Sequence, residues 1–137
     1  MPETLTFDIT YLYEDSVEGI AIPVTLISGG GIYRAAAKVD PGAEVCLFSR
    51  EAGEQLGLDV ESGIPKLLGS LTGTLDSFGH EVTIQTFGIM MDSMVYFSKY
   101  TGLTRNILGR LGWIRNLQIG LRDYENKLFV SKYQSEV

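Results

Sequence analysis

The sequence has little of what disulfides, metal centres, nucleic-acid surfaces and membrane spans require. Its 137 residues include one cysteine, Cys46, and one histidine, His80. An internal disulfide is therefore excluded, and we expect no metal and no other cofactor. Acidic side chains outnumber basic ones by 17 to 11, whereas a nucleic-acid surface needs a concentrated basic patch. No apolar run approaches the roughly 20 residues that span a bilayer, so we expect no membrane partner.

The N-terminal residues also lack a targeting pattern. Met1, Pro2, Glu3 and Thr4 provide neither the basic region nor the apolar region of a secretory signal peptide. Together with the single cysteine, this favours a cytoplasmic protein. The cysteine lies in an apolar run, which predicts a buried and inert thiol rather than a nucleophile.

What the sequence does contain is a series of short segments in which apolar and polar residues alternate, a pattern typical of half-buried strands. Its 16 glycines suggest many tight turns, and 137 residues suit one domain. We therefore predict a single all-β domain over residues 1–137, built as a closed, mostly antiparallel barrel. The predicted strands are residues 4–11, 20–26, 33–39, 45–48, 65–71, 80–87, 94–97, 117–121 and 128–130.

Two short helices and one long loop are expected between these strands. Ser49 is a good N-cap for a helix through Leu56. A second helix is predicted over residues 111–117, carrying Trp113 inward. The glycine-rich residues 72–79 lie between two predicted strands, which indicates a mobile hairpin loop.

One stretch places a single carboxylate, Asp40, between an apolar strand and a tight turn, and a second apolar strand begins at Val45. A carboxylate at the end of a buried strand is costly unless its charge is satisfied or used. Gly42 lets backbone come close to that carboxylate, and Ala43 adds almost no bulk. Taken alone, Asp, Pro and Gly are turn residues, so a plain β-turn is the simpler interpretation of the stretch.

The order apolar–Asp–X–Gly–Ala–X–apolar around Asp40 resembles the active-site loop of the retroviral-type aspartic proteases, the retropepsins. Residues 107–110, Ile-Leu-Gly-Arg, resemble the apolar–apolar–Gly–Arg segment of the same family. Between the two lies the glycine-rich hairpin, where a retropepsin has its flap. The resemblance covers about residues 18–131 and implies a retropepsin-type barrel.

The resemblance also implies an aspartic endopeptidase that cleaves peptide or protein substrates. Such proteolysis needs two carboxylates sharing one proton, and this chain has one Asp–X–Gly–Ala segment. A homodimer follows, in which each protomer supplies Asp40 as the catalytic residue. The residues expected to bind substrate are Gly42, Ala43, Gly73 and Thr74.

Three further residues are expected to support the Asp40 loop, namely Pro41, Glu44 and Arg110. The resemblance implies an ion pair between Glu44 and Arg110. Pro41 departs from the family, in which a Thr or Ser at this place clasps its counterpart across the dimer through its hydroxyl and backbone N–H. Proline has neither group.

Two alternatives to an active protease therefore stay open. The chain could be a catalytically weak or inactive retropepsin-like module that binds peptides or dimerises, which Pro41 favours. It could also be a small β-barrel that binds another ligand. A Ser–His–Asp triad is disfavoured, because the spacing of the serine and aspartate residues from His80 does not support one.

Overall fold

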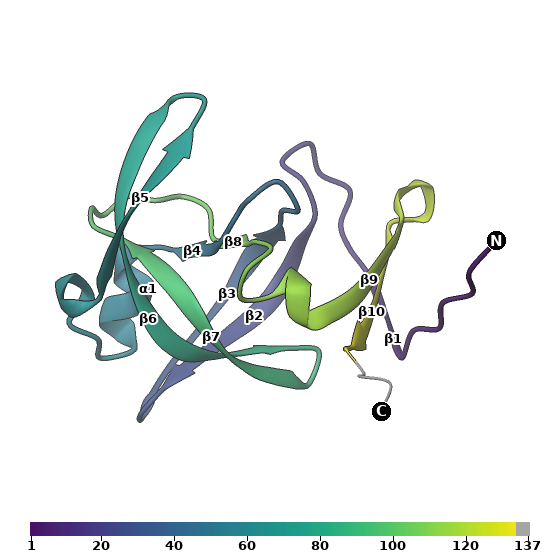
Figure 1. Cartoon of the computed structure of the whole chain (residues 1–137), viewed down its shortest axis with the longest axis horizontal. Coiled ribbons are helices and arrows are strands. Elements are labelled where there is room, and N and C mark those ends of the chain that lie inside the picture. Colours follow the sequence, from purple (N-terminus) through teal and green to yellow (C-terminus); the bar gives the residue numbers. More distant parts are fainter. Residues whose placement is uncertain (134–137) are drawn as a thin grey trace.

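The alternating segments of the sequence form two β-sheets (Figure 1). The computed structural model of the protein describes residues 1–133, in which strands dominate and helix is scarce. This confirms the all-β class. The strands are β1 (Ile9–Leu12), β2 (Ala21–Ser28), β3 (Gly31–Val39), β4 (Cys46–Phe48), β5 (Ile64–Ser70), β6 (Gly73–Thr86), β7 (Ile89–Ser98), β8 (Ile107–Leu108), β9 (Leu117–Arg122) and β10 (Lys127–Lys132).

Six of the strands close into one barrel. Neighbours pair in the order β2-β3-β8-β4-β7-β6, and β6 returns to β2, where Leu26 pairs with Ile84. The β3–β8 and β4–β7 pairs are parallel, and the remaining pairs are antiparallel. The predicted closed and mostly antiparallel barrel is thus confirmed, with β5 added to β6 outside the closed ring.

The barrel closes because its strands present alternate apolar side chains to a common core. Along β2, Ile22, Val24 and Leu26 are buried, whereas Ala21 and Pro23 are exposed. The proline is tolerated because this half of β2 pairs with β3 alone, so no second ladder needs its missing N–H.

The first predicted helix is confirmed as α1 (Arg50–Gln55). Its N-cap is Ser49, whose hydroxyl oxygen accepts a 3.1 Å hydrogen bond from the Ala52 backbone N–H. Two other short helical turns are of the 3-10 type, η1 (Val60–Ser62) and η3 (Asp123–Glu125). No helix within residues 1–133 has the length and apolar character that crossing a membrane would take.

The second predicted helix is wrong. Residues 111–117 contain only a 3-10 turn, η2 (Ile114–Asn116). Gly112 adopts a φ of +106°, which no α-helical residue has, and from Leu117 the chain is extended to pair with β10. Trp113 is nevertheless fully buried, and its indole N–H donates a 3.1 Å hydrogen bond to the Thr86 hydroxyl.

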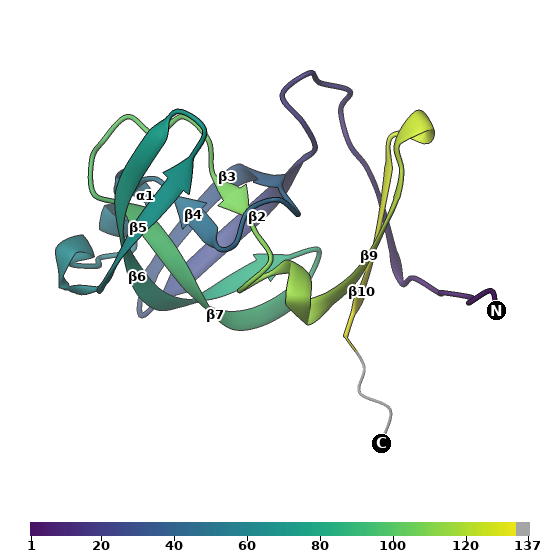
Figure 2. The ribbon, with the colours of Figure 1, turned by 45° about the horizontal axis from the view of Figure 1, so that its top comes forward.

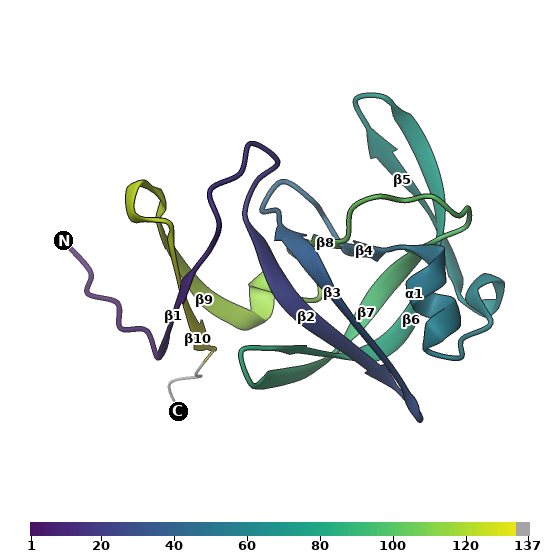
Figure 3. The same cartoon turned by 180° about the vertical axis from the view of Figure 1, so that it is seen from behind.

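Strands β5 and β6 form a hairpin that projects from the barrel (Figures 1 and 3). Its turn is only Leu71 and Thr72, because Ser70 already pairs with Gly73. The loop predicted over residues 72–79 is therefore wrong, and residues 73–79 belong to β6. Gly79 serves close packing instead, since a Cβ there would stand 2.8 Å from the Tyr96 ring.

The second sheet joins the two ends of the described chain in the order β1-β10-β9 and lies beside the barrel (Figure 2). Ile9 pairs with Val130, which is fully buried. Residues 4–8, predicted as part of the first strand, precede it, and the Asp8 N–H donates instead to the Ser131 hydroxyl at 2.9 Å.

Candidate active site

The Asp40 carboxylate stands at the point where β3 ends and the chain turns. The Asp40 backbone N–H donates to the Leu108 carbonyl at 3.0 Å, which fixes the strand end against β8. The Gly42 N–H donates to Asp40 Oδ1 at 2.9 Å, and the Ala43 N–H donates to the Asp40 carbonyl at 3.1 Å. The tight turn predicted from the sequence therefore holds the carboxylate by its own backbone.

The segment after β8 packs directly behind this loop. The Arg110 N–H donates to the Ala43 carbonyl at 2.9 Å, and the Leu111 N–H donates to the Glu44 carbonyl at 2.8 Å. Gly109 allows this approach, because a Cβ there would stand 2.9 Å from the Ala43 carbonyl oxygen. The two segments that carry the family resemblance thus lie side by side through backbone contacts.

The ion pair expected between Glu44 and Arg110 is not formed. Among residues 1–133, Arg110 has no carboxylate within 4.0 Å, and its side chain is exposed. Glu44 pairs with Lys66 of β5 instead, at 3.2 Å between Nζ and Oε1. The physical reason is that the Glu44 carboxylate lies toward the β5–β6 hairpin, where Lys66 can reach it, so the pair links the hairpin to the Asp40 loop.

A groove of about 430 Å³ opens between the Asp40 loop and the hairpin. It is lined by the loop and β4, by the hairpin, and by the segment before and within β8. Of the four residues expected to bind substrate, Gly42 and Ala43 lie in its wall, and Gly73 and Thr74 lie outside it on the exposed end of the hairpin. The lining residues are Gly42, Ala43, Glu44, Val45, Leu47, Leu67, Leu68, Gly69, Ser70, Leu75, Leu103 and Ile107.

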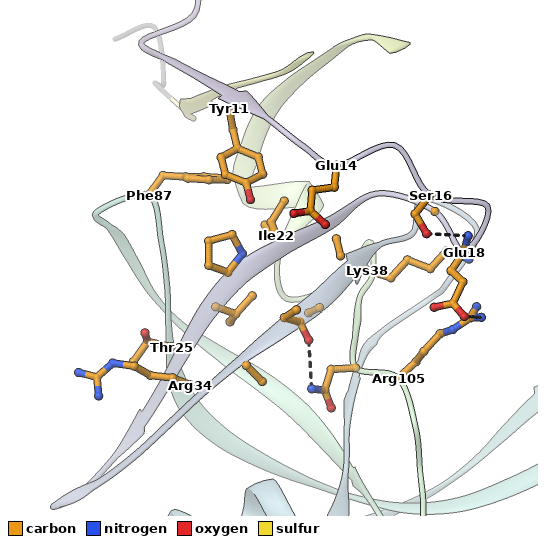
Figure 4. A pocket seen from close by; sticks show the side chains of 18 of the residues that line it. Tyr11, Glu14, Ser16, Glu18, Ile22, Thr25, Arg34, Lys38, Phe87 and Arg105 are labelled. Atoms are coloured by element: carbon orange, nitrogen blue, oxygen red, sulfur yellow. Dashed lines mark hydrogen bonds and ion pairs between the residues drawn. The ribbon is translucent and has the colours of Figure 1, made fainter. Parts of the chain in front are cut away.

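A larger hollow of about 930 Å³ lies on the outside of the barrel, against β2 and β3 (Figure 4). At one end the rings of Tyr11 and Phe87 meet at 5.2 Å between centroids, and at the other Arg105 pairs with Glu18 at 3.7 Å. Its lining carries charges of both signs and includes no residue of the Asp40 loop, whereas Gly42, Ala43 and Glu44, next to Asp40, line the smaller groove. We therefore place the candidate chemistry at the smaller groove.

The other chemically reactive residues have structural roles. Cys46 is fully buried, and burial raises the pKa of its thiol to about 11. His80 lies with Nε2 at 2.8 Å from the Val60 carbonyl oxygen. Within residues 1–133, no three His, Cys, Asp or Glu side chains gather as a metal site would require.

No family model matches the sequence, and no curated protein matches it either. Among solved structures, the chain is similar to the retroviral EIAV protease in its complex with the inhibitor HBY-793, with a TM-score of 0.55 and 17% identity over 72% of this chain and 88% of that chain. The chain has a retroviral-protease fold. At this identity the likeness concerns the fold alone.

Within this retroviral-protease fold, the Asp40 loop could be predicted from the sequence, but most of the residues that line the groove could not. The leucines of the hairpin and Leu103 line it, and Lys66 pairs with Glu44, the carboxylate found in its lining within residues 1–133. The only available signal was the apolar content of residues 65–71, which predicted a strand without indicating the direction of its side chains. Leu103 lies between the predicted strand over residues 94–97 and residues 107–110, where the sequence predicts no strand or helix.

Proposed function

We propose that the protein is an aspartic endopeptidase in which Asp40 activates a water molecule to attack a peptide bond. One observation carries this proposal. The Asp40 carboxylate is oriented by the Gly42 N–H beside an apolar groove, in a chain with a retroviral-protease fold. The N–H engages Oδ1 and leaves Oδ2 to act on water or to share a proton with a second carboxylate.

The proposal requires two copies of the chain, because the chain has one Asp–X–Gly–Ala segment and the reaction needs two carboxylates. A homodimer with its two-fold axis between the two Asp40 side chains supplies them. Like charges that close cannot both ionise, so the carboxylates share one proton and titrate as a pair. Pro41 and Gly42 are exposed at the loop, which leaves it accessible to a second copy.

In the proposed complex an extended peptide lies in the groove, and the β5–β6 hairpin covers it as a flap. Gly42 and Ala43 bring backbone groups to the peptide from below. Gly73 and Thr74, at the exposed end of the hairpin, would contact it from above. The cytoplasmic location expected from the sequence belongs to the same proposal and is tested by cell fractionation.

A second candidate is a peptide-binding or dimerisation module with weak or no catalysis, and Pro41 favours it. Proline brings no N–H and no hydroxyl to the exposed loop that would meet the partner. Each missing neutral hydrogen bond is worth about 0.5–1.5 kcal/mol. Several such losses at a two-fold axis could hold the two carboxylates apart.

The deciding experiment is digestion of a peptide library at acidic pH, read by mass spectrometry, with the parent protein and two variants. Asp40→Asn removes the proposed acid–base group, and we expect it to lower cleavage by about 10²–10⁴-fold. Asp92→Asn is the matched control, since Asp92 is an exposed aspartate of β7 that accepts a hydrogen bond from the Thr83 hydroxyl. We expect this control to cleave like the parent.

The other outcomes separate the two candidates. Cleavage that survives Asp40→Asn refutes the aspartic mechanism. Peptide binding without cleavage in the parent protein supports the binding module instead.

A further inference from the structure

The groove beside Asp40 combines an apolar wall with a single charge. Eight of the residues that line it are Ala, Val, Leu or Ile, and among the described residues Glu44 is the one ionisable side chain in its lining. These residues are the lining that one protomer contributes, and the preference of the groove for a guest side chain is argued from them.

The charge in this lining does not stand alone. Lys66 Nζ lies 3.2 Å from Glu44 Oε1, and the lysine side chain is the less exposed of the two, at 30% against 63%. Lys66 itself is not part of the groove lining. Its ammonium lies 6.0 Å from the centroid of the Tyr96 ring, and its backbone carbonyl accepts a 2.7 Å hydrogen bond from the Ser77 hydroxyl.

We propose that Lys66 sets the charge selectivity of this groove, so that it takes an uncharged apolar side chain and discriminates against lysine and arginine. The inference rests on the proposed function, because it assigns the groove to a peptide side chain. With Lys66 in place, the Glu44 carboxylate is already paired, and a guest ammonium gains little by entering. Without it, an unpaired and half-exposed carboxylate stands in an otherwise apolar wall and attracts a basic guest.

The expected effect is modest because the pair is partly solvated. Exposed ion pairs are screened by water, so we expect the preference for a basic over an apolar guest to change by about threefold to tenfold rather than by orders of magnitude. Lys66→Met is the suitable variant, since methionine keeps most of the apolar stem and Lys66 does not line the groove. The effect should weaken at high salt.

The probe is a set of octapeptides with leucine at the two central positions. At each position in turn, the residue is replaced by norleucine in one peptide and by lysine in another. The ratio of kcat/KM for the lysine and norleucine peptides is measured in the parent, in Lys66→Met and in Lys66→Met/Glu44→Gln. Lys127→Met is the matched control, since Lys127 also lies on a strand and pairs with a glutamate, Glu125, at 3.6 Å.

We expect the ratio to rise about threefold to tenfold in Lys66→Met at one peptide position. It should return to the parent value in the double variant, and it should stay unchanged in Lys127→Met. An unchanged ratio in Lys66→Met overturns the proposal. So does a rise that persists in the double variant, because Glu44 would then not be the attracting charge. An equal fall in kcat/KM for all peptides overturns the proposal as well, since Lys66 would then only hold the hairpin to the loop.

Binding separates this inference from the proposed function. The same peptides, fluorescently labelled, are titrated by anisotropy into each variant carrying Asp40→Asn in addition. If Lys66→Met raises the affinity for the lysine peptide relative to the norleucine peptide, and no form that keeps Asp40 cleaves either peptide, the inference stands and the proposed protease function is refuted. Failure of every form to bind any peptide overturns the inference.

Discussion

Replacing Gly109 with alanine should damage the candidate site from behind. Gly109 follows β8 and is buried against the Asp40 loop. A Cβ at this position would stand 2.7 Å from the Val45 carbonyl carbon and 2.9 Å from the Ala43 carbonyl oxygen. Both neighbours are backbone atoms, which cannot rotate away as a flexible side chain can. The loop itself has to move.

The size of the effect follows from what that movement disturbs. Overpacking a tight site costs about 1–3 kcal/mol. The displacement also strains the hydrogen bonds from the Arg110 N–H to Ala43 and from the Leu111 N–H to Glu44, at 2.9 and 2.8 Å, each worth about 0.5–1.5 kcal/mol. Because the two hydrogen bonds are strained and not fully lost, we expect these terms together to lower the free energy of unfolding by about 2–5 kcal/mol.

Thermal unfolding followed by circular dichroism measures this loss. At about 3 °C per kcal/mol for a domain of this size, Gly109→Ala should lower Tm by about 6–15 °C. Gly30→Ala is the matched control, because no atom lies within 4 Å of a Cβ built there. We expect it to leave Tm nearly unchanged. A Tm for Gly109→Ala within about 2 °C of this control would refute the view that Gly109 anchors the loop.

Two further predictions concern the loop and the core. Pro41→Thr restores a hydroxyl and a backbone N–H to the exposed loop, so the dimer should persist at concentrations about tenfold lower, equivalent to about 1.4 kcal/mol, and hydrolysis should rise with it. Sedimentation measures the dimer, and a weaker dimer in this variant would contradict the reasoning. Burial raises the pKa of the Cys46 thiol from 9.0 to about 11, so the unfolded chain ionises first, and this contribution to stability is complete below pH 9 and is lost as the pH rises toward 11. Urea unfolding measures the free energy of unfolding at about pH 8 and about pH 10. Between these two pH values it should fall more in the parent than in Cys46→Ala, and an equal fall in both proteins would contradict the prediction.

The barrel and the Asp40 loop could be predicted because their residues carry strong local constraints. The alternation of Ile22, Val24 and Leu26 allows one arrangement on a half-buried strand, and the structure buries all three. Asp40 and Gly42 form a turn that is closed by their own side chain and backbone. Such features depend on neighbours in sequence, so the sequence alone reveals them.

The features that could not be predicted depend on distant neighbours. The apolar spacing of residues 111–117 suits a helix, but pairing of Leu117 with Lys132 draws the chain out as a strand. The sequence predicts Gly79 in a loop, whereas in the structure it makes room for the Tyr96 ring. Nothing local to Glu44 indicates that Lys66 is its partner, because that contact depends on how the hairpin twists over the loop.

The pairing of β1 with β10 has a consequence for the order in which the parts of the protein fold during synthesis. Ile9 finds its partner in Val130, almost the whole chain away, and contacts of such long sequence separation form slowly. During synthesis, β2 to β8 leave the ribosome first and can close the barrel. Until β10 follows, β1 is unpaired, and its backbone N–H and C=O groups are accessible to solvent and to chaperones. The β1-β10-β9 sheet can therefore form only after the chain through Lys132 has been synthesised and has left the ribosome.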